Sequence, residues 1–435
     1  MISHLKSITE EDIPKTNPTL KSYFSLSTNE KNASSSFETN AIAGQLVGFQ
    51  LNKQLSSSFE ETKFIKEVLE QFKLSMSTEE AIEIIQEIYF PDGKLPIFSP
   101  LMYMSRPYQS LDAKTKKSLE LFLQMMQVSE LSASSQNDLN FLEQHIYTQF
   151  EQYVRSETKI STSSSYIHYL EKFFTQDFNY LLSNPHTFKS NIDTFLKFYL
   201  FTYSAQLTLN VQTTTFEEPS LKPLYFILNH EQASTERKSL GRNGYKTLID
   251  KTRYLFPYLS LLEFLANATE KKDLKLFDLA TINDTSENIQ VIDNITKIFR
   301  HARSLSEPGL ITSSTIEDAL KNLLNTAFEQ FKGDKKAVID RFISAYEKQI
   351  SGPFIQSRGR SGKVLVLDQD TVLLLTNLSI GTNEKLRFQD LLIEFKNRGV
   401  FFDPKSEDIL LDLYERVGNI ERKSDSGDAV YVRAI

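Results

Sequence analysis

The chain has 435 residues, which exceeds the size at which one hydrophobic core usually stops growing, so two or three domains are expected. Hydrophobic residues make up 40% of the chain and its formal net charge is −7, which excludes global disorder and a surface coated with basic residues. Cysteine is absent, which excludes disulfides, thiolate nucleophiles and cysteine-type zinc or iron–sulfur sites.

The first forty residues predict a loosely ordered N-terminal arm (1–40), because they are rich in Ser, Thr, Asn and Lys and lack hydrophobic periodicity. Glu10, Glu11 and Asp12 interrupt the stretch in which a secretory signal would carry its apolar run. Elsewhere no segment reaches the roughly 20 apolar residues of a membrane span. We therefore expect a cytoplasmic protein that makes no membrane contact.

Residues 41–350 predict a helical body, with a possible sub-boundary at the Ser- and Thr-rich stretch near 157–165. Amphipathic segments recur behind hydroxyl and carboxylate residues at capping-box spacing, such as Ser314 with Glu317. The best strand candidate in the body is 207–213. No fixed-period repeat is present, which argues against a regular solenoid.

A basic segment at 236–253 carries six positive and two negative side chains. Its glycines predict a loop that leads into a helix, and Tyr245 and Tyr254 could stack on exposed bases. This segment is either the solvated start of a helix or a contact with a DNA backbone or a partner. The candidate DNA-binding residues are Arg237, Lys238, Arg242 and Lys246.

A second basic segment, 351–362, predicts a Gly-rich linker. Its end, Gly-Arg-Ser-Gly-Lys at 359–363, lacks the four residues between glycines and the Ser or Thr after Lys that a phosphate-binding loop requires, so ATP binding is not expected. It is either a flexible linker or a phosphate contact made by Arg358, Arg360 and Lys363.

The last segment, 363–435, shows the order of elements of a winged-helix domain. An apolar strand at 364–367 precedes predicted helices at 371–379, at about 384–398, and from Asp403-Pro404 to Gly418. Residues Ile420–Lys423 and Ala429–Arg433 then predict a hairpin. The third helix should bury Ile409, Leu410, Leu413, Tyr414 and Val417. The predicted fold is mainly α: an irregular multi-helix body with a C-terminal winged-helix (α+β) domain.

The third of these helices is acidic, since it carries Glu407, Asp408, Asp412 and Glu415 against Lys405 and Arg416. DNA phosphates would repel such a helix. If the domain binds DNA, the hairpin should do so through Arg422, Lys423 and Arg433. If it binds a protein, the acidic helix is the expected docking face. Both interpretations stay open.

No catalytic motif is legible, and we expect no cofactor and no metal site. The six histidines are scattered singly, so a metal site would need ligands from distant parts of the chain. Asp368 and Asp370 could serve a nuclease, although capping of the following helix explains them more simply. Asp425 and Asp428 could ligate a divalent ion, but a tight turn also requires such residues.

Four stretches of the C-terminal part resemble one protein family: 359–363, 388–395 (Phe-Gln-Asp-Leu-Leu-Ile-Glu-Phe), 398–403 (Arg-Gly-Val-Phe-Phe-Asp) and 421–432, which ends in Asp-Ala-Val-Tyr-Val. They are similar to the C-terminus of the DptG family, also called DndG, of DNA phosphorothioation-dependent restriction proteins. The Pro-Leu-Tyr-Phe-Ile-Leu stretch at 223–228 and the length also agree.

This resemblance implies a subunit of a bacterial anti-phage restriction complex that damages DNA lacking phosphorothioate. Its partners would be two ATPase subunits, the F and H proteins, and DNA. We expect a non-catalytic subunit that bridges DNA and these ATPases. The alternatives are a nuclease of unrecognised type in the same system and a winged-helix regulator.

Overall fold

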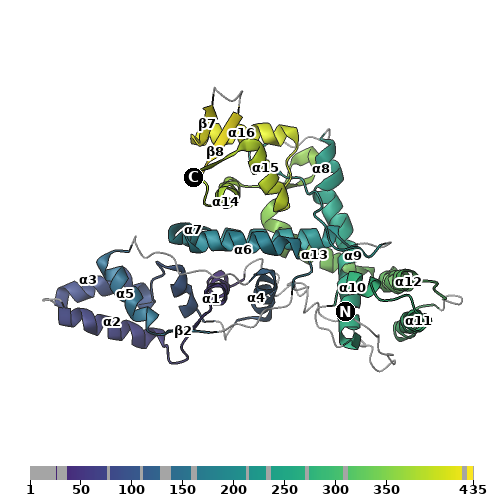
Figure 1. Cartoon of the computed structure of the whole chain (residues 1–435), viewed down its shortest axis with the longest axis horizontal. Coiled ribbons are helices and arrows are strands. Elements are labelled where there is room, and N and C mark those ends of the chain that lie inside the picture. Colours follow the sequence, from purple (N-terminus) through teal and green to yellow (C-terminus); the bar gives the residue numbers. More distant parts are fainter. Residues whose placement is uncertain are drawn as a thin grey trace. The chain divides into compact units, whose positions relative to one another are not determined.

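The computed structural model describes residues 26, 37–75, 79–107, 111–127, 139–157, 164–211, 215–231, 237–269, 274–306, 312–423 and 429–434 (Figure 1). Helices make up 67% and strands 8%, so the fold is mainly α, as predicted. None of the helices in these ranges is both long enough and apolar enough to cross a membrane.

The chain forms two compact units. Of the described residues, the N-terminal unit contains 37–157 and 171–197, and the C-terminal unit contains 26, 164–170 and 198–434. Helices α6 (Tyr169–Leu182) and α7 (Pro185–Leu209) contribute residues to both units.

The N-terminal unit is a set of short helices around an aromatic core. Its other elements are α1 (Thr39–Gln50), β1 (Lys53–Leu55), α2 (Glu61–Ser75), α3 (Glu79–Tyr89), η3 (Pro91–Gly93), η4 (Pro100–Ser105), α4 (Ala113–Met125), α5 (Phe141–Glu151) and β2 (Val154–Ser156). The ring of Phe174 lies between Phe122 and Phe178, with centroid distances of 5.7 and 6.2 Å. Helix α1 approaches η4 so closely that a Cβ atom on Gly44 would lie 2.2 Å from the Tyr103 carbonyl oxygen.

The C-terminal unit begins with a helical layer. Its helices are α8 (Lys238–Asn243), α9 (Tyr245–Thr269), α10 (Leu276–Ala280), α11 (Ser286–Ala302), α12 (Ile316–Glu329), η5 (Gly333–Lys335), α13 (Lys336–Tyr346), η6 (Glu347–Ser351) and η7 (Gly352–Phe354). Phe256 of α9 packs on Phe331 and Phe342, at centroid distances of 5.4 and 5.3 Å.

One strand prediction is wrong: residues 207–209 are the last turn of α7. Apolar and polar residues alternate from Leu207 to Val211, which is a strand pattern, but the whole segment is buried. Thr208 and Asn210 are buried because their side chains donate to the Ser204 and Gln206 carbonyls, each at 2.8 Å. A short run of buried residues cannot be assigned to helix or strand from periodicity.

A three-stranded sheet joins distant parts of the C-terminal unit. Its order is β3 (Ile227–Leu228), β5 (Lys363–Leu367), β4 (Ile355–Ser357), with β3 parallel and β4 antiparallel to β5. The range 351–362, which we expected as a linker, therefore contains η7 and β4, followed by η8 (Gly359–Ser361).

The chain ends in a helix–strand–helix–helix–hairpin arrangement, which we call the terminal module. It consists of α14 (Gln369–Ile380), β6 (Lys385–Arg387), α15 (Phe388–Asn397), α16 (Pro404–Val417), β7 (Ile420–Lys423) and β8 (Ala429–Arg433). Its antiparallel sheet has the order β6-β8-β7, with Val432 of β8 opposite both Leu386 and Ile420.

The predicted helix at 384–398 begins too early, because residues 385–387 pair with β8 and form β6. The predicted start and end of α16 are confirmed: Asp403 accepts the Ser406 N–H at 3.0 Å, and Gly418 is left-handed with φ +81°. The buried face of α16 is narrower than we predicted, because Ile409 is half-buried and Val417 is 37% exposed.

Candidate DNA and partner interface

Residues 224–231 attach the terminal module to the rest of the C-terminal unit. The Phe226 N–H donates to the Phe401 carbonyl at 2.9 Å, and the Phe401 N–H donates to the Leu224 carbonyl at 3.1 Å. The Asn229 N–H donates to the Leu367 carbonyl at 3.0 Å. This extended segment therefore brings Glu231 to the start of α16.

Arg237 lies in a buried ion cluster with Glu231, Asp403 and Ser406. Its Nε donates to Asp403 Oδ2 at 2.6 Å and its Nη2 to Ser406 Oγ at 2.7 Å, while its guanidinium also pairs with Asp403 Oδ1 and Glu231 Oε1. The side chains of Arg237, Glu231 and Asp403 are 7%, 0% and 9% exposed. Arg237, one of the predicted DNA-binding residues, therefore lies inside the protein with its guanidinium N–H groups already paired with two carboxylates.

Within this cluster, the pairing of Arg237 with Asp403 favours the charged form of each side chain. Burial raises the pKa of Asp403, but hydrogen bonds from Arg237 and from the Ser406 N–H hold that pKa below its usual value. Burial lowers the pKa of Arg237, yet the bonds to Asp403 and Glu231 raise it above its usual value. The pairing thus favours the charged forms of Asp403 and Arg237, and the cluster joins the segment before α8 to α16.

Lys238, Arg242 and Lys246 form an exposed basic ridge on α8 and the start of α9. Lys238 and Arg242 are four residues apart in the chain and so lie one above the other on a helix. Among the described residues, none of these three cations forms an ion pair. The ridge is free to meet an external anion.

The tyrosines of this segment have partners inside the protein. The Tyr254 ring lies 5.3 Å from that of Phe328, and the Tyr245 hydroxyl donates to Glu347 Oε2 at 2.8 Å. Lys363 also pairs with Glu347, and its Nζ lies 5.9 Å from the centroid of the Tyr245 ring. Both rings thus already contact groups of the protein, although Tyr254 is 40% exposed.

The basic residues between η7 and β5 are only partly available. The Arg358 guanidinium donates to the Asn229 carbonyl, and its backbone N–H donates to the Gly362 carbonyl at 2.8 Å. Lys363 is exposed but carries the Glu347 carboxylate. The side chain of Arg360 lies outside the described residues.

The hairpin cations are paired with acids of the terminal module. Arg422 pairs with Glu415 of α16, and Arg433 pairs with Glu421 at 2.7 Å. Glu421 also accepts from Lys385 at 2.8 Å, and hydrogen bonds from Lys385 and Arg433 lower its pKa to about 2. The Lys423 side chain and the turn with Asp425 and Asp428 lie outside the described residues.

Helix α16 presents an acidic face made of Asp408, Asp412 and Glu415, all exposed. Glu407 is half-buried, and burial raises its pKa. Beside this face, a shallow cavity of about 590 Å³ is lined by His230, Ile409, Asp412, Glu415 and Arg416. Arg416 Nη2 and His230 Nε2 in its lining lie 3.2 Å apart.

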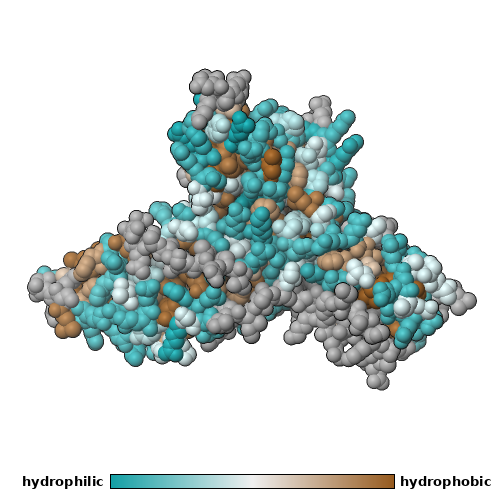
Figure 2. All heavy atoms as spheres, in the orientation of Figure 1, coloured by the Kyte–Doolittle hydropathy of each residue, from teal (hydrophilic) through white to brown (hydrophobic). Residues whose placement is uncertain are grey.

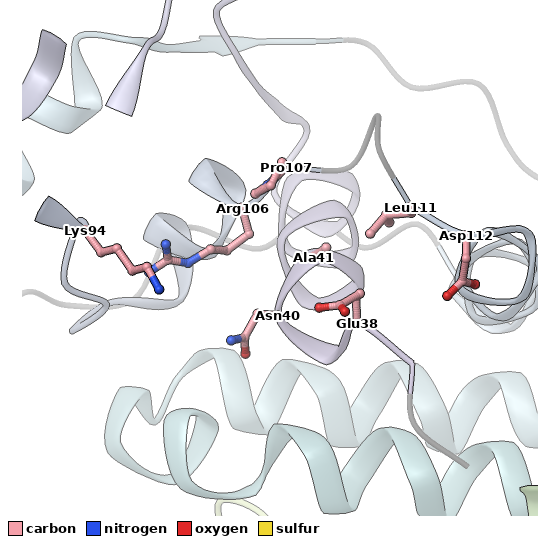
Figure 3. Close-up of a pocket in the computed structure, with 8 residues that line it drawn as sticks. All are labelled: Glu38, Asn40, Ala41, Lys94, Arg106, Pro107, Leu111 and Asp112. Atoms are coloured by element: carbon pink, nitrogen blue, oxygen red, sulfur yellow. The ribbon is translucent and has the colours of Figure 1, made fainter. Parts of the chain in front are cut away.

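A second cavity lies in the N-terminal unit and measures about 530 Å³ (Figure 3). Arg106 in its wall pairs with Glu61 at 3.3 Å and donates to the Leu95 carbonyl at 2.8 Å. Asp112 caps α4 by accepting the Thr115 N–H at 2.7 Å. Both polar groups thus stabilise the local fold, and we assign no function to this cavity.

The acids considered for a nuclease do not converge. Asp368 caps α14 by accepting the Thr371 N–H at 2.8 Å, as predicted, and Asp370 is exposed in the first turn of the same helix. Within the described part of the chain, no group of three His, Asp or Glu side chains is arranged to hold a metal ion.

Three residues of this region were not among the sequence candidates: Glu231, Ser406 and Glu347. Each contacts a predicted DNA-binding cation. Glu231 and Ser406 bond to Arg237, and Glu347 pairs with Lys363. Their only sequence signal is that Glu231 stands a few residues before the basic segment. Ser406 and Glu347 lie far along the chain from Arg237 and Tyr245, so spacing could not reveal these contacts.

No protein-family model matches this sequence, and no curated protein matches it.

Proposed function

We propose that this chain is a non-catalytic subunit of a bacterial phosphorothioation-dependent restriction complex, and that it bridges DNA and the partner ATPases, the F and H proteins. One observation carries the proposal. The C-terminal unit exposes a basic ridge (Lys238, Arg242, Lys246) and, elsewhere, an acidic face on α16 (Asp408, Asp412, Glu415). A protein that holds a polyanion and a second protein at once needs two such surfaces.

The terminal module is best assigned to the winged-helix class. The order helix–strand–helix–helix–hairpin and the β6-β8-β7 sheet support this assignment. In this class α16 would be the helix that commonly enters the major groove of DNA. Its exposed Asp408 and Asp412 would meet phosphates there, so we assign α16 to protein docking instead.

The basic ridge is the favoured DNA contact because none of its three cations pairs with an acid of the described residues. Arg422 and Arg433 would have to exchange Glu415 and Glu421 for phosphates, and that exchange offsets part of the gain. Lys238, Arg242 and Lys246 need no such exchange. Each phosphate that a cation neutralises contributes about 0.9 to the slope of log affinity against log salt, so three contribute about 2.7.

The test replaces all three ridge residues by glutamine and measures binding of the full chain to a short fluorescein-labelled duplex by anisotropy over a series of KCl concentrations. The slope should flatten by roughly 2 to 3 for any duplex sequence. The matched control removes the same charge from exposed lysines elsewhere in the unit: Lys297, Lys335 and Lys336. An unchanged slope in the ridge variant, or equal flattening in the control, would remove the ridge from the DNA contact.

The docking part is tested separately by Asp408→Lys with Asp412→Lys. These residues are exposed and one helical turn apart, so the chain should fold normally. Co-purification with the two ATPase subunits should be lost while DNA binding is kept. Normal assembly would exclude this face, and metal-dependent nicking by the purified chain would overturn the non-catalytic assignment.

A further inference from the structure

Exposed apolar side chains are concentrated at one end of the N-terminal unit. Seven large apolar side chains of the described residues are exposed, and four of them lie on α2, α3 and α5: Leu74, Ile84, Ile88 and Phe141, at 90%, 56%, 66% and 78%. Figure 2 shows hydrophobic surface over this end of the unit. Such clusters on a folded protein mark interaction sites more often than isolated apolar residues do.

Helix α3 is apolar on two adjoining sides. Ile82 and Ile85 are buried, whereas Ile84 and Ile88 face outward and are one helical turn apart. This outward pair continues the buried stripe around the helix. A surface helix needs only one apolar stripe to attach to its own unit, so the second is available for another molecule.

The start of α5 extends this surface. The side-chain amide of Asn140 donates to the Tyr89 hydroxyl at 3.0 Å, which holds the end of α3 beside the first residue of α5, Phe141. Asn140 also caps α5 in a reciprocal capping box with Glu143. Ile84, Ile88 and Phe141, which we call the α3 face, therefore stand on helices whose ends are fixed.

The charges that α3 itself carries indicate the occupant of the α3 face. Glu80, Glu83 and Glu87 of α3 are exposed, and the sequence of this helix contains neither Lys nor Arg. A second copy of the face would oppose carboxylates to carboxylates, and an anionic lipid surface would be repelled in the same way. A helix with an apolar stripe and flanking cations complements both the apolar centre and the acidic edge.

We propose that the α3 face is a docking site for a basic amphipathic helix of a partner protein. Ile84 and Ile88 supply anchors at helical spacing, Phe141 supplies a large apolar end, and the three glutamates select lysine or arginine. The site uses residues of the N-terminal unit alone. It is therefore independent of the DNA and ATPase contacts proposed for the C-terminal unit.

The probe is a designed fluorescein-labelled peptide that carries leucines on one helical face and lysines on the other. Two companion peptides carry glutamate in place of lysine, or the same residues in scrambled order. The full chain should bind the basic peptide roughly tenfold or more tightly than either companion. Ile84→Ser with Ile88→Ser should weaken that binding by a similar factor, and Glu83→Lys with Glu87→Lys should reverse the preference toward the acidic peptide.

Ile393→Ser is the matched control, because Ile393 is 52% exposed but lies on α15 in the other unit; it should leave peptide binding unchanged. The proposal is overturned if the chain does not bind the basic peptide, if the scrambled peptide binds equally well, or if the paired serine substitutions have no effect. Sedimentation of the unmodified chain adds one more outcome. A dimer that the serine substitutions dissociate would assign the face to a second copy and refute the basic partner.

Discussion

Replacement of Arg237 by methionine should destabilise the C-terminal unit by about 3–5 kcal/mol, the usual cost of removing one partner from a buried ion pair. Methionine retains much of the length of the side chain but leaves Glu231 and Asp403, at 0% and 9% exposure, without the guanidinium that neutralises them. A loss of this size is a large part of the roughly 5–15 kcal/mol that stabilises a folded domain.

The effect should depend on pH in a defined direction. In the unmodified chain the pKa of Asp403 is lowered, so its ionised form stabilises the fold above the usual pKa near 3.9, and this contribution is lost as pH falls through the folded value. In Arg237→Met the bonds from Arg237 are lost, so burial, the largest influence on the pKa of Asp403, is opposed only by the bonds from Ser406 and that pKa should rise. The variant should therefore lose stability relative to the unmodified chain as pH rises. The difference between the two proteins should therefore be larger at neutral pH than at about pH 5.

Urea unfolding followed by circular dichroism gives the overall loss, and hydrogen exchange gives the local one. The amides to follow are those of Leu228 and Ser406, which donate to Glu231 and Asp403 at 3.0 Å each. Arg242→Met is the exposed control and should change stability by less than about 0.5 kcal/mol.

A variant without any charge in the cluster separates the loss of ion pairing from the loss of packing. Arg237→Met combined with Glu231→Gln and Asp403→Asn removes every charge of the cluster, and most of the lost stability should return because no buried charge is left unpaired. A loss of unfolding free energy below about 1 kcal/mol in Arg237→Met would show that the cluster does not stabilise the terminal module. A triple variant no more stable than Arg237→Met would show the same.

Three further predictions concern other elements. Gly44→Ala should sharply lower the melting temperature, because the new Cβ would lie 2.2 Å from a carbonyl oxygen. Gly241→Ala is the control: Gly241 on α8 has open space around it, so the change should be neutral or stabilise by about 0.5–1 kcal/mol. Equal effects of the two substitutions would contradict the close approach of α1 to η4. Asp368→Ala should cost about 1 kcal/mol in thermal unfolding and Asp368→Ser much less, because serine can still cap α14; identical melting temperatures would exclude the cap. Lys385→Met should raise the pKa of Glu421 from about 2 toward its usual value in a carbon-13 NMR titration, and an unmoved pKa would assign the shift to another cause.

Signals within a few residues of one another predicted much of the terminal module. Asp403-Pro404 and Gly418 mark the ends of α16, and Ile420–Lys423 with Ala429–Arg433 pair as the predicted hairpin. Capping and hairpin pairing depend on neighbours in the chain, so their residues are visible together in the sequence.

Sequence-based prediction was wrong where the pairing partner of a residue lies far along the chain. Leu386 is in a strand because Val432 pairs with it, and nothing near Leu386 indicates that pairing.

The N-terminal cap of α12 differs from its prediction by one residue. The cap is Thr315, which accepts the Asp318 N–H at 3.1 Å, whereas the predicted pair was Ser314 and Glu317. Two adjacent hydroxyls satisfy the same local rule, so the sequence alone could not distinguish between them.

The mainly helical class and the positions of the basic and acidic runs follow from the sequence alone, because periodicity and charge are written in the order of the residues. Which of those charges face solvent was decided by the tertiary structure. Arg237 and Lys238 are neighbours in one basic run, yet the first is buried between Glu231 and Asp403 and the second is exposed. A buried cation requires carboxylates around it, and here only the folded chain brings them together.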